Sequence, residues 1–148
     1  MKLDIKDFIE MQKKKQWAKE SNNKGAMSAE EIISKLKEFK DSKKLIVIEM
    51  NNEIFTSNFA ADSWRGSYNL PAIEYYSSKS GCSIKSAIEN IQEIDGLKVE
   101  GYKGGDYILN KEDPLFIANY GESNNCTAIV DIKESDDFII CLAKQDMY

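Results

Sequence analysis

The clearest structural pattern of the chain lies in residues 28–55, SAEEIISKLKEFKDSKKLIVIEMNNEIF. Ser28 and Glu31 form a capping-box pair, which begins a helix because each side chain binds the other residue's backbone N–H. The β-branched run at 45–48 predicts a buried strand, and Asn51-Asn52 predicts a tight turn into a short strand at 54–55. The helix has one apolar face at helical spacing, made of Ile32, Ile33, Leu36 and Phe39.

Downstream of this unit, the sequence predicts one more helix and several strands. Apolar residues repeat with a helical period over 83–94, and Gly96 is the natural stop. Residues 57–66 are predicted to be a polar loop, and Pro71 indicates an edge strand or a bulge. β-branched and aromatic residues between turn signals predict strands at 67–76, 97–102, 106–109, 116–120, 126–132 and 138–143.

The first 25 residues are predicted to form a separate helical arm. Residues 3–20 carry a weak apolar stripe (Leu3, Ile5, Phe8, Ile9, Trp17), and the SNNKG run at 21–25 breaks the helix. The rest, 26–148, is expected to be a single α+β domain, which suits a chain of 148 residues. Most links between strands are too short for parallel crossovers, so we expect a mainly antiparallel sheet with about three helices, packed on one face.

Composition restricts the classes of function. The net charge of −5 argues against non-specific binding to nucleic acid, which needs a basic surface. No apolar run reaches the roughly 18 residues that span a bilayer, and the N-terminus does not resemble a signal peptide. Three cysteines without CxxC spacing indicate reduced thiols in a cytosol, and a disulfide pair is the alternative: Cys82, Cys126 and Cys141.

The absence of histidine narrows the chemistry further. It removes the commonest general base and the commonest zinc ligand, so triad and histidine–metal mechanisms are excluded. We expect no enzyme activity, catalytic residue, cofactor or metal. The weakest alternative is an enzyme that uses Asp62, Glu74 or Asp106 with a divalent metal, because no close carboxylate pair lies among these residues.

One segment combines an arginine with aromatic residues, 62–68, DSWRGSY. The chain has 20 basic residues, and Arg65 is the one that is not lysine, so a planar five-donor fork is indicated there. Trp64 and Tyr68 offer flat faces, and Gly66 allows close approach of a ligand. The cluster suits a flat anionic ligand, and the structural alternative is a loop tied to a carboxylate around a core tryptophan.

A second segment, 101–107, GYKGGDY, places glycines between tyrosines. Lys103 and the backbone N–H groups of Gly104 and Gly105 could bind an anion as a nest. Tyr102 and Tyr107 could then stack on a base. The local alternative, a hairpin turn that needs glycine at positive φ, is favoured by the pattern itself, because the P-loop spacing is absent.

Together these motifs give the chain a resemblance to a family. SWRGSY, then GYKGGDY, then a strand that ends in Tyr-Gly at 120–121, resembles small proteins that are encoded mainly by bacteriophages and have no assigned reaction. The resemblance covers residues 60–121, and Pro71 departs from the family's usual pattern. It implies a phage accessory protein in the host cytosol that counters host defence, for example by sequestering a nucleotide second messenger.

The leading functional hypothesis is therefore a non-catalytic protein that binds a nucleotide-like anionic ligand, with the two motifs close together in space. The alternative is a protein–protein inhibitor of a host protein, in which the motifs are structural. A homo-oligomer is compatible with both hypotheses. The predicted ligand-binding residues are Trp64, Arg65, Ser67, Tyr68, Tyr102, Lys103, Gly104, Gly105, Asp106 and Tyr107.

Overall fold

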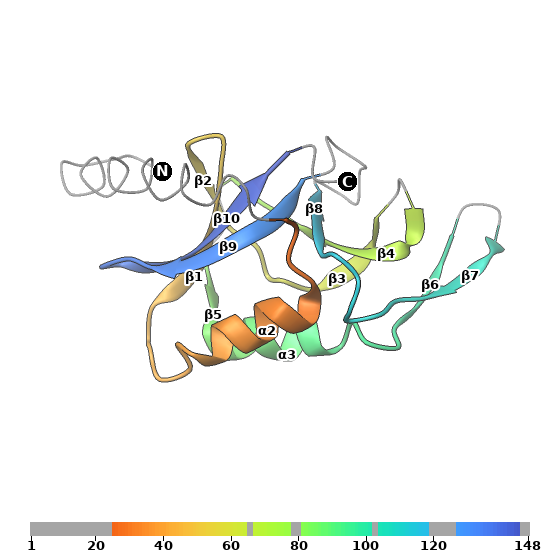
Figure 1. Ribbon diagram of the computed structural model, residues 1–148, viewed down its shortest axis with the longest axis horizontal. Helices are drawn as coiled ribbons and strands as arrows, with labels where there is room; N and C mark the ends of the chain where they lie inside the picture. The colour runs from red at the N-terminus through yellow and green to blue at the C-terminus, as the bar shows by residue number, and fades with distance from the viewer. Residues whose placement is uncertain (1–24, 65–66, 78–80, 102–103, 119–126, 146–148) are drawn as a thin grey trace.

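The computed structural model describes residues 25–64, 67–77, 81–101, 104–118 and 127–145, which form one α+β domain (Figure 1). Strands dominate, and two helices lie within the described residues. The elements are α2 Ala29–Lys37, β1 Leu45–Met50, β2 Glu53–Phe55, β3 Ala61–Trp64, β4 Ser67–Glu74, β5 Cys82–Ser83, α3 Ile84–Gln92, β6 Lys98–Glu100, β7 Asp106–Ile108, β8 Phe116–Ala118, β9 Ala128–Glu134 and β10 Phe138–Lys144.

Both helices begin at serine caps. Ser28 Oγ accepts a hydrogen bond from the Glu31 N–H at 3.1 Å, and the Ser28 N–H donates to Glu31 Oε1 at 3.1 Å, so the predicted capping box is confirmed. Ser83 caps α3 in the simpler way, by accepting from the Ser86 N–H at 3.1 Å. The chain after α3 turns at Gly96, whose φ of 82° is readily adopted only by glycine.

The main sheet is mixed, which corrects the expectation of a mainly antiparallel sheet. Its strand order is β2-β1-β10-β9-β8-β4-β3, and β5 pairs with the other half of the β1 edge. β1 runs parallel to β10, with Leu45 beside Phe138, and β4 runs parallel to β8, with Ala72 beside Phe116. In each parallel pair the two strands are far apart in sequence, and α3 lies in the connection between them. The short connections between consecutive strands therefore could not predict these parallel pairs.

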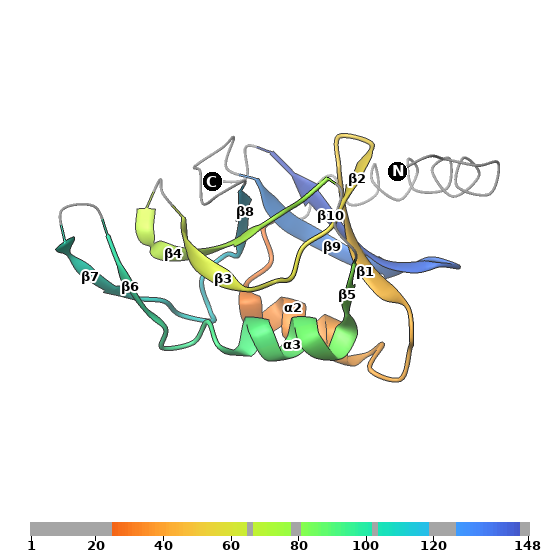
Figure 2. The same ribbon diagram turned by 180° about the vertical axis from the view of Figure 1, so that it is seen from behind.

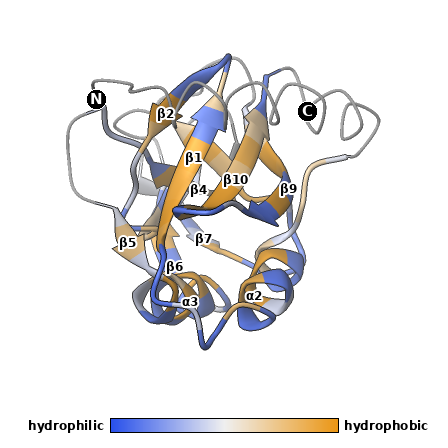
Figure 3. Ribbon diagram, turned by 90° about the vertical axis from the view of Figure 1, so that its left-hand side faces the viewer, coloured by the Kyte–Doolittle hydropathy of each residue, from blue (hydrophilic) through white to orange (hydrophobic). Residues whose placement is uncertain are grey.

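The sheet arches over the two helices, as Figure 3 shows end-on. Past the ends of β2 and β4, Thr56 and Tyr76 exchange two backbone hydrogen bonds of 2.8 and 2.7 Å. This bridge joins the two sides of the sheet. Figures 1 and 2 show α2 and α3 side by side across the open side of the arch, which confirms that the helices pack on one face.

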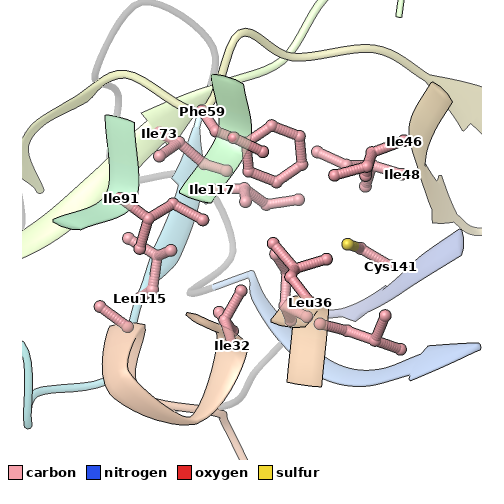
Figure 4. Close-up of a cluster of buried hydrophobic side chains, with 14 of the residues drawn as sticks. Ile32, Leu36, Ile46, Ile48, Phe59, Ile73, Ile91, Leu115, Ile117 and Cys141 are labelled. Atoms are coloured by element: carbon pink, nitrogen blue, oxygen red, sulfur yellow. The ribbon is translucent and has the colours of Figure 1, made fainter. Parts of the chain in front are cut away.

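The hydrophobic core fills the space between the arch and the helices (Figure 4). Phe59 enters it from the loop after β2, fully buried, with a φ of 59° that is rare for a bulky residue. In β10, for example, Ile139, Cys141 and Ala143 point into this core at alternate positions, as the period of a strand requires. Its members include Ile32, Leu36, Ile46, Ile48, Ile73, Ile91, Leu115, Ile117 and Cys141.

The opposite face of the sheet, here called the outer face, is also apolar. One cluster lies over β4, β8 and the start of β9, and a second lies over β1, β9 and β10. In β1, for example, Ile46 and Ile48 point to the helices and Val47 points to the outer face. The second cluster contains Val47, Val130, Ile140 and Leu142, with Ile54 and Phe138 packed against it.

Some sequence-based boundaries were wrong. Residues 57–66 were expected to be loop, but β3 forms there as the last strand of the sheet, paired with β4. Its polar composition and short length hid it. Pro71 lies in β4 opposite Ser63, directly beside a register shift between Ser63 and Trp64, so the predicted irregularity is confirmed although β4 is not the edge strand. The predicted helix over 3–20 lies outside the described residues.

Candidate functional site

The SWRGSY segment belongs to the β3–β4 hairpin. Trp64 ends β3, Ser67 begins β4, and the two residues are paired across the hairpin. Arg65 and Gly66 lie between these strands in sequence and outside the described residues. Of Trp64, Ser67 and Tyr68, the structure describes the backbone, so their strands position them but the expected stacking and hydrogen-bonding roles of their side chains remain predictions.

The GYKGGDY segment connects β6 and β7, as the hairpin alternative predicted. The strands pair with Val99 beside Tyr107 and Glu100 beside Asp106. The Gly101 N–H donates to Gly105 O at 2.6 Å, and the Gly104 N–H donates to Gly101 O at 3.2 Å. Gly104 has a φ of 79°, so the turn itself requires this glycine.

This geometry changes the role expected for Gly104. A backbone nest binds an anion through N–H groups that point at the ligand, whereas the Gly104 N–H is already bonded within the turn. Tyr102 and Lys103, which were expected to flank the nest, lie outside the described residues. The anion-binding expectation therefore passes from Gly104 to the side chains of Arg65 and Lys103.

Asp106 has a partner that sequence reasoning missed. Its Oδ2 atom lies 3.3 Å from Lys98 Nζ on the neighbouring strand, and the two side chains are 58% and 65% exposed. Such an exposed pair contributes about 0–1 kcal/mol, so a ligand could replace it at small cost. The signal was available only through the hairpin register, which brings β6 and β7 residues diagonally together.

The Tyr107 ring lies against the turn. A Cβ atom added at Gly105 would lie 3.6 Å from Tyr107 Cε2, which shows how closely the ring approaches that glycine. Tyr107 remains 38% exposed and its neighbour Ile108 is 60% exposed. The hairpin therefore presents aromatic and aliphatic surface to solvent next to a charged pair, an arrangement suited to binding.

The two hairpins lie at the same end of the molecule. Figures 1 and 2 both show the β6–β7 hairpin beside the β3–β4 end of the main sheet, and β4 and β7 approach within 8 Å between Cα atoms. The strands that carry the two motifs are thus neighbours in space although some thirty residues separate the motifs. The expected proximity of Arg65 to Lys103 concerns residues outside the described ones and stays a prediction.

Two of the three carboxylates named for an enzyme have separate partners. Asp106 pairs with Lys98, whereas Glu74 Oε2 accepts a hydrogen bond of 3.1 Å from the Tyr76 hydroxyl at the other end of β4. Among the described residues, no group of three or more cysteine, aspartate or glutamate side chains could hold a metal ion. Nor does any helix in those residues have the length and apolar character to cross a membrane.

Two hollows elsewhere have less binding character. A hollow of about 280 Å³ lies between the helices, and its charges already interact, since the Lys111 N–H donates to Asp95 Oδ1 at 3.3 Å and Lys111 Nζ lies 4.0 Å from Glu30. A hollow of about 300 Å³ lies beside Glu49 and Leu142, at one end of the outer face. No aromatic side chain that could stack on a base lies among the described residues that line either hollow.

Two of the three cysteines are free thiols, as predicted, and Cys126 lies outside the described residues. Cys141 is completely buried in the core, and this burial raises its pKa to about 12, because the thiolate loses its hydration there. Burial also raises the pKa of the half-buried Cys82. Neither thiol has the lowered pKa of a nucleophilic cysteine.

Comparisons of the chain with protein families, with curated proteins and with solved structures found no match. The family resemblance of the two motifs therefore stays a prediction.

Proposed function

We propose that this chain is a non-catalytic binding protein that holds a nucleotide-like anionic ligand where the β3–β4 and β6–β7 hairpins adjoin. The observation that carries the proposal is the approach of β7 to β4, since it makes neighbours of two strands whose motifs combine basic, aromatic and glycine residues. Ligand sites of this kind need aromatic faces for a base and a few convergent polar groups.

Each part of the ligand has candidate partners. Arg65 and Lys103 would hold the phosphates, because a guanidinium fork and an ammonium are the usual phosphate contacts. Asp106 would leave Lys98 and accept a hydrogen bond from a ribose hydroxyl or base amine, which frees Lys98 for a phosphate. The base would stack on one or more of Trp64, Tyr68, Tyr102 and Tyr107, with Ser67 and the Gly105 backbone beside it.

The family resemblance supplies the biological setting of the proposal. A phage accessory protein in the cytosol of its host could counter host defence by sequestering a nucleotide second messenger. Sequestration needs affinity and an excess of protein, and it needs no general base or metal. A chain without histidine is suited to this role.

The proposal is tested by thermal unfolding of the full chain against a panel of mono-, di- and cyclic nucleotides. A ligand present at 100 times its Kd should stabilise the protein by about 2.7 kcal/mol, which is easily measured. Inorganic phosphate and the parent nucleosides serve as controls, since the proposal requires both anion and base for full stabilisation. Absence of stabilisation by every nucleotide, at millimolar concentration, would end it.

A protein partner is the second candidate, and Ile108 favours it. Ile108 is 60% exposed and its neighbour Tyr107 is 38% exposed, so the hairpin offers an apolar surface that a protein partner could cover. Capture from host lysate by the wild-type chain, lost in Ile108→Asp and retained in Glu100→Gln on the same hairpin, would support this candidate. Equal capture by both variants would count against it.

A further inference from the structure

The apolar residues of the outer face of the sheet are buried, although no described helix packs on them. Val47, Val130, Ile140 and Leu142 are each at most 4% exposed, although the described members of their cluster are all strand residues and the helices lie on the other face (Figure 3). An apolar sheet face is stable in water when a second layer covers it. The low exposure shows that this face is covered, and the two described helices do not supply the cover.

The chain that precedes the described residues starts at this face. Ala26 packs against the outer-face cluster of β4, β8 and β9. One residue later, the Met27 N–H donates to Ile129 O at 2.8 Å, directly beside Val130. Residue 24 is thus three residues from an anchor on β9, a reach of roughly 10 Å at most. The segment 1–24 therefore joins the described domain beside the outer face.

The composition of residues 1–24 matches the face. Ile5, Phe8 and Ile9 recur at helical spacing and would form one apolar side of a helix. The segment has seven lysines against four acidic residues, a charge of +3 within a chain of net charge −5. The outer face carries two acidic residues, since the buried Glu49 and the half-buried Asp131 pair in register with Ile54 and Leu142, respectively.

We propose that residues 1–24 of the same chain dock as an amphipathic helix on the outer face formed by β1, β2, β9 and β10. Their Ile5, Phe8 and Ile9 side lies against Val47, Val130 and Leu142, and their lysines lie near Asp131. A helix over residues 3–20 would be about 27 Å long at 1.5 Å per residue, enough to cross four strands spaced about 4.8 Å apart. The arm is then a third layer of the domain and not a detached tether, and the inference holds whether or not a nucleotide binds.

The test is methyl NMR of the full-length chain with labelled isoleucine, leucine and valine. Docking predicts nuclear Overhauser contacts from the Ile5 or Ile9 methyl groups to those of Val47, Val130 or Leu142. A sample that mixes labelled and unlabelled chains distinguishes the occupants. Contacts within one chain support the proposal, whereas contacts only between chains would assign the face to a second copy and overturn it. Absence of any such contact would also overturn it.

A matched pair of variants tests the same point independently. Phe8→Asp places a charge on the apolar side, and Lys14→Asp places the same residue on the opposite side of the predicted helix. We expect Phe8→Asp to shift the outer-face methyl resonances and to raise the fluorescence of bound 8-anilinonaphthalene sulfonate at least about twofold, because apolar surface is exposed. Lys14→Asp should leave both unchanged. Equal behaviour of the two variants would contradict docking, and if Phe8→Asp fails to fold, the wild-type methyl contacts decide.

Discussion

Gly104 and Gly105 are adjacent in one turn, but only the backbone of Gly104 has a conformation that favours glycine. Gly104 has a φ of 79°, whereas a Cβ at Gly105 would meet the Tyr107 ring at an ordinary contact distance of 3.6 Å. A left-handed conformation costs a residue with a side chain about 1–2 kcal/mol. The hairpin is therefore sensitive at the first glycine and tolerant at the second.

We predict that Gly104→Ala destabilises the β6–β7 hairpin and that Gly105→Ala does not. Amide hydrogen exchange of β6 and β7 should accelerate by roughly tenfold in the first variant, as expected for a loss near 1.4 kcal/mol in local opening. Nucleotide affinity should fall with it. Similar exchange rates in the two variants would show that the turn geometry does not hold the hairpin.

Position 65 is the one basic position at which the sequence has arginine and not lysine. Lysine occupies the other 19 basic positions, so a point charge was available there and was not used. Arg65→Lys keeps the charge but loses the planar fork, so nucleotide binding should weaken by about 1.5–3 kcal/mol while the melting temperature barely changes. Calorimetric titration and a melt of each protein measure the two effects. A destabilised variant with unchanged affinity would reverse the assignment to a structural tie.

Cys141 provides a pH-dependent prediction. Its pKa rises from 9.0 to about 12 on burial, so the native state keeps the thiol proton where the unfolded chain loses it. This contribution to stability is present below pH 9 and is lost as the pH rises from 9 to 12. At pH 9, iodoacetamide should label Cys141 only after unfolding, whereas the half-buried Cys82 should react slowly in the native state. Rapid native labelling of Cys141, read by peptide mass spectrometry, would contradict its burial.

At the scale of elements, α2 depends on its cap. Ser28 closes the capping box, and Ser34 is exposed in the middle of the same helix. We predict that Ser28→Ala lowers the free energy of unfolding by about 1 kcal/mol, because an orphan backbone N–H loses its acceptor. Ser34→Ala should be neutral or slightly stabilising, since alanine is the better helix former. Urea unfolding of both variants measures the two changes. Equal losses in the free energy of unfolding would show that the Ser28 cap does not stabilise α2.

Elements with strong local signals could be predicted from sequence, and those fixed by distant partners could not. The capping box of α2, the apolar period of α3 and the Asn51-Asn52 turn are local, and all three are confirmed, with φ of 52° and 65° at the two asparagines. β3 was missed because ADSW has little strand character and pairs only through β4. The parallel pairing of β1 with β10 joins residues more than ninety positions apart, which no local pattern encodes.

In the candidate site too, local features could be predicted from the sequence, and features fixed by distant partners could not. The Gly-Gly turn and its flanking strands could be predicted, because turn chemistry is local. The Lys98–Asp106 pair and the approach of β7 to β4 depend on register and packing, so only the structure reveals them. Likewise, the hydrogen bond from the Gly104 N–H to Gly101 O is a feature of the turn that only the structure reveals.

At the scale of the whole molecule, the two faces of the sheet have different tasks. The inner face packs on α2 and α3 and supplies the stable core, and the apolar outer face is where we propose that residues 1–24 dock. The β6–β7 hairpin stands outside both layers as a separate two-stranded sheet (Figure 1). Binding there would leave the core undisturbed, as expected for a preformed site on a rigid scaffold.

A nucleotide-like ligand is proposed to bind where the two hairpins adjoin. This proposal is tested most directly by ¹H–¹⁵N correlation spectra of the full chain, titrated with the most stabilising nucleotide of the panel. We predict saturable shifts confined to residues 64–68, including the Trp64 indole, and to residues 98–107 of the β6–β7 hairpin. Shifts that instead cluster around Glu30, Asp95 and Lys111 between the helices, or no saturable shifts at all, would contradict it.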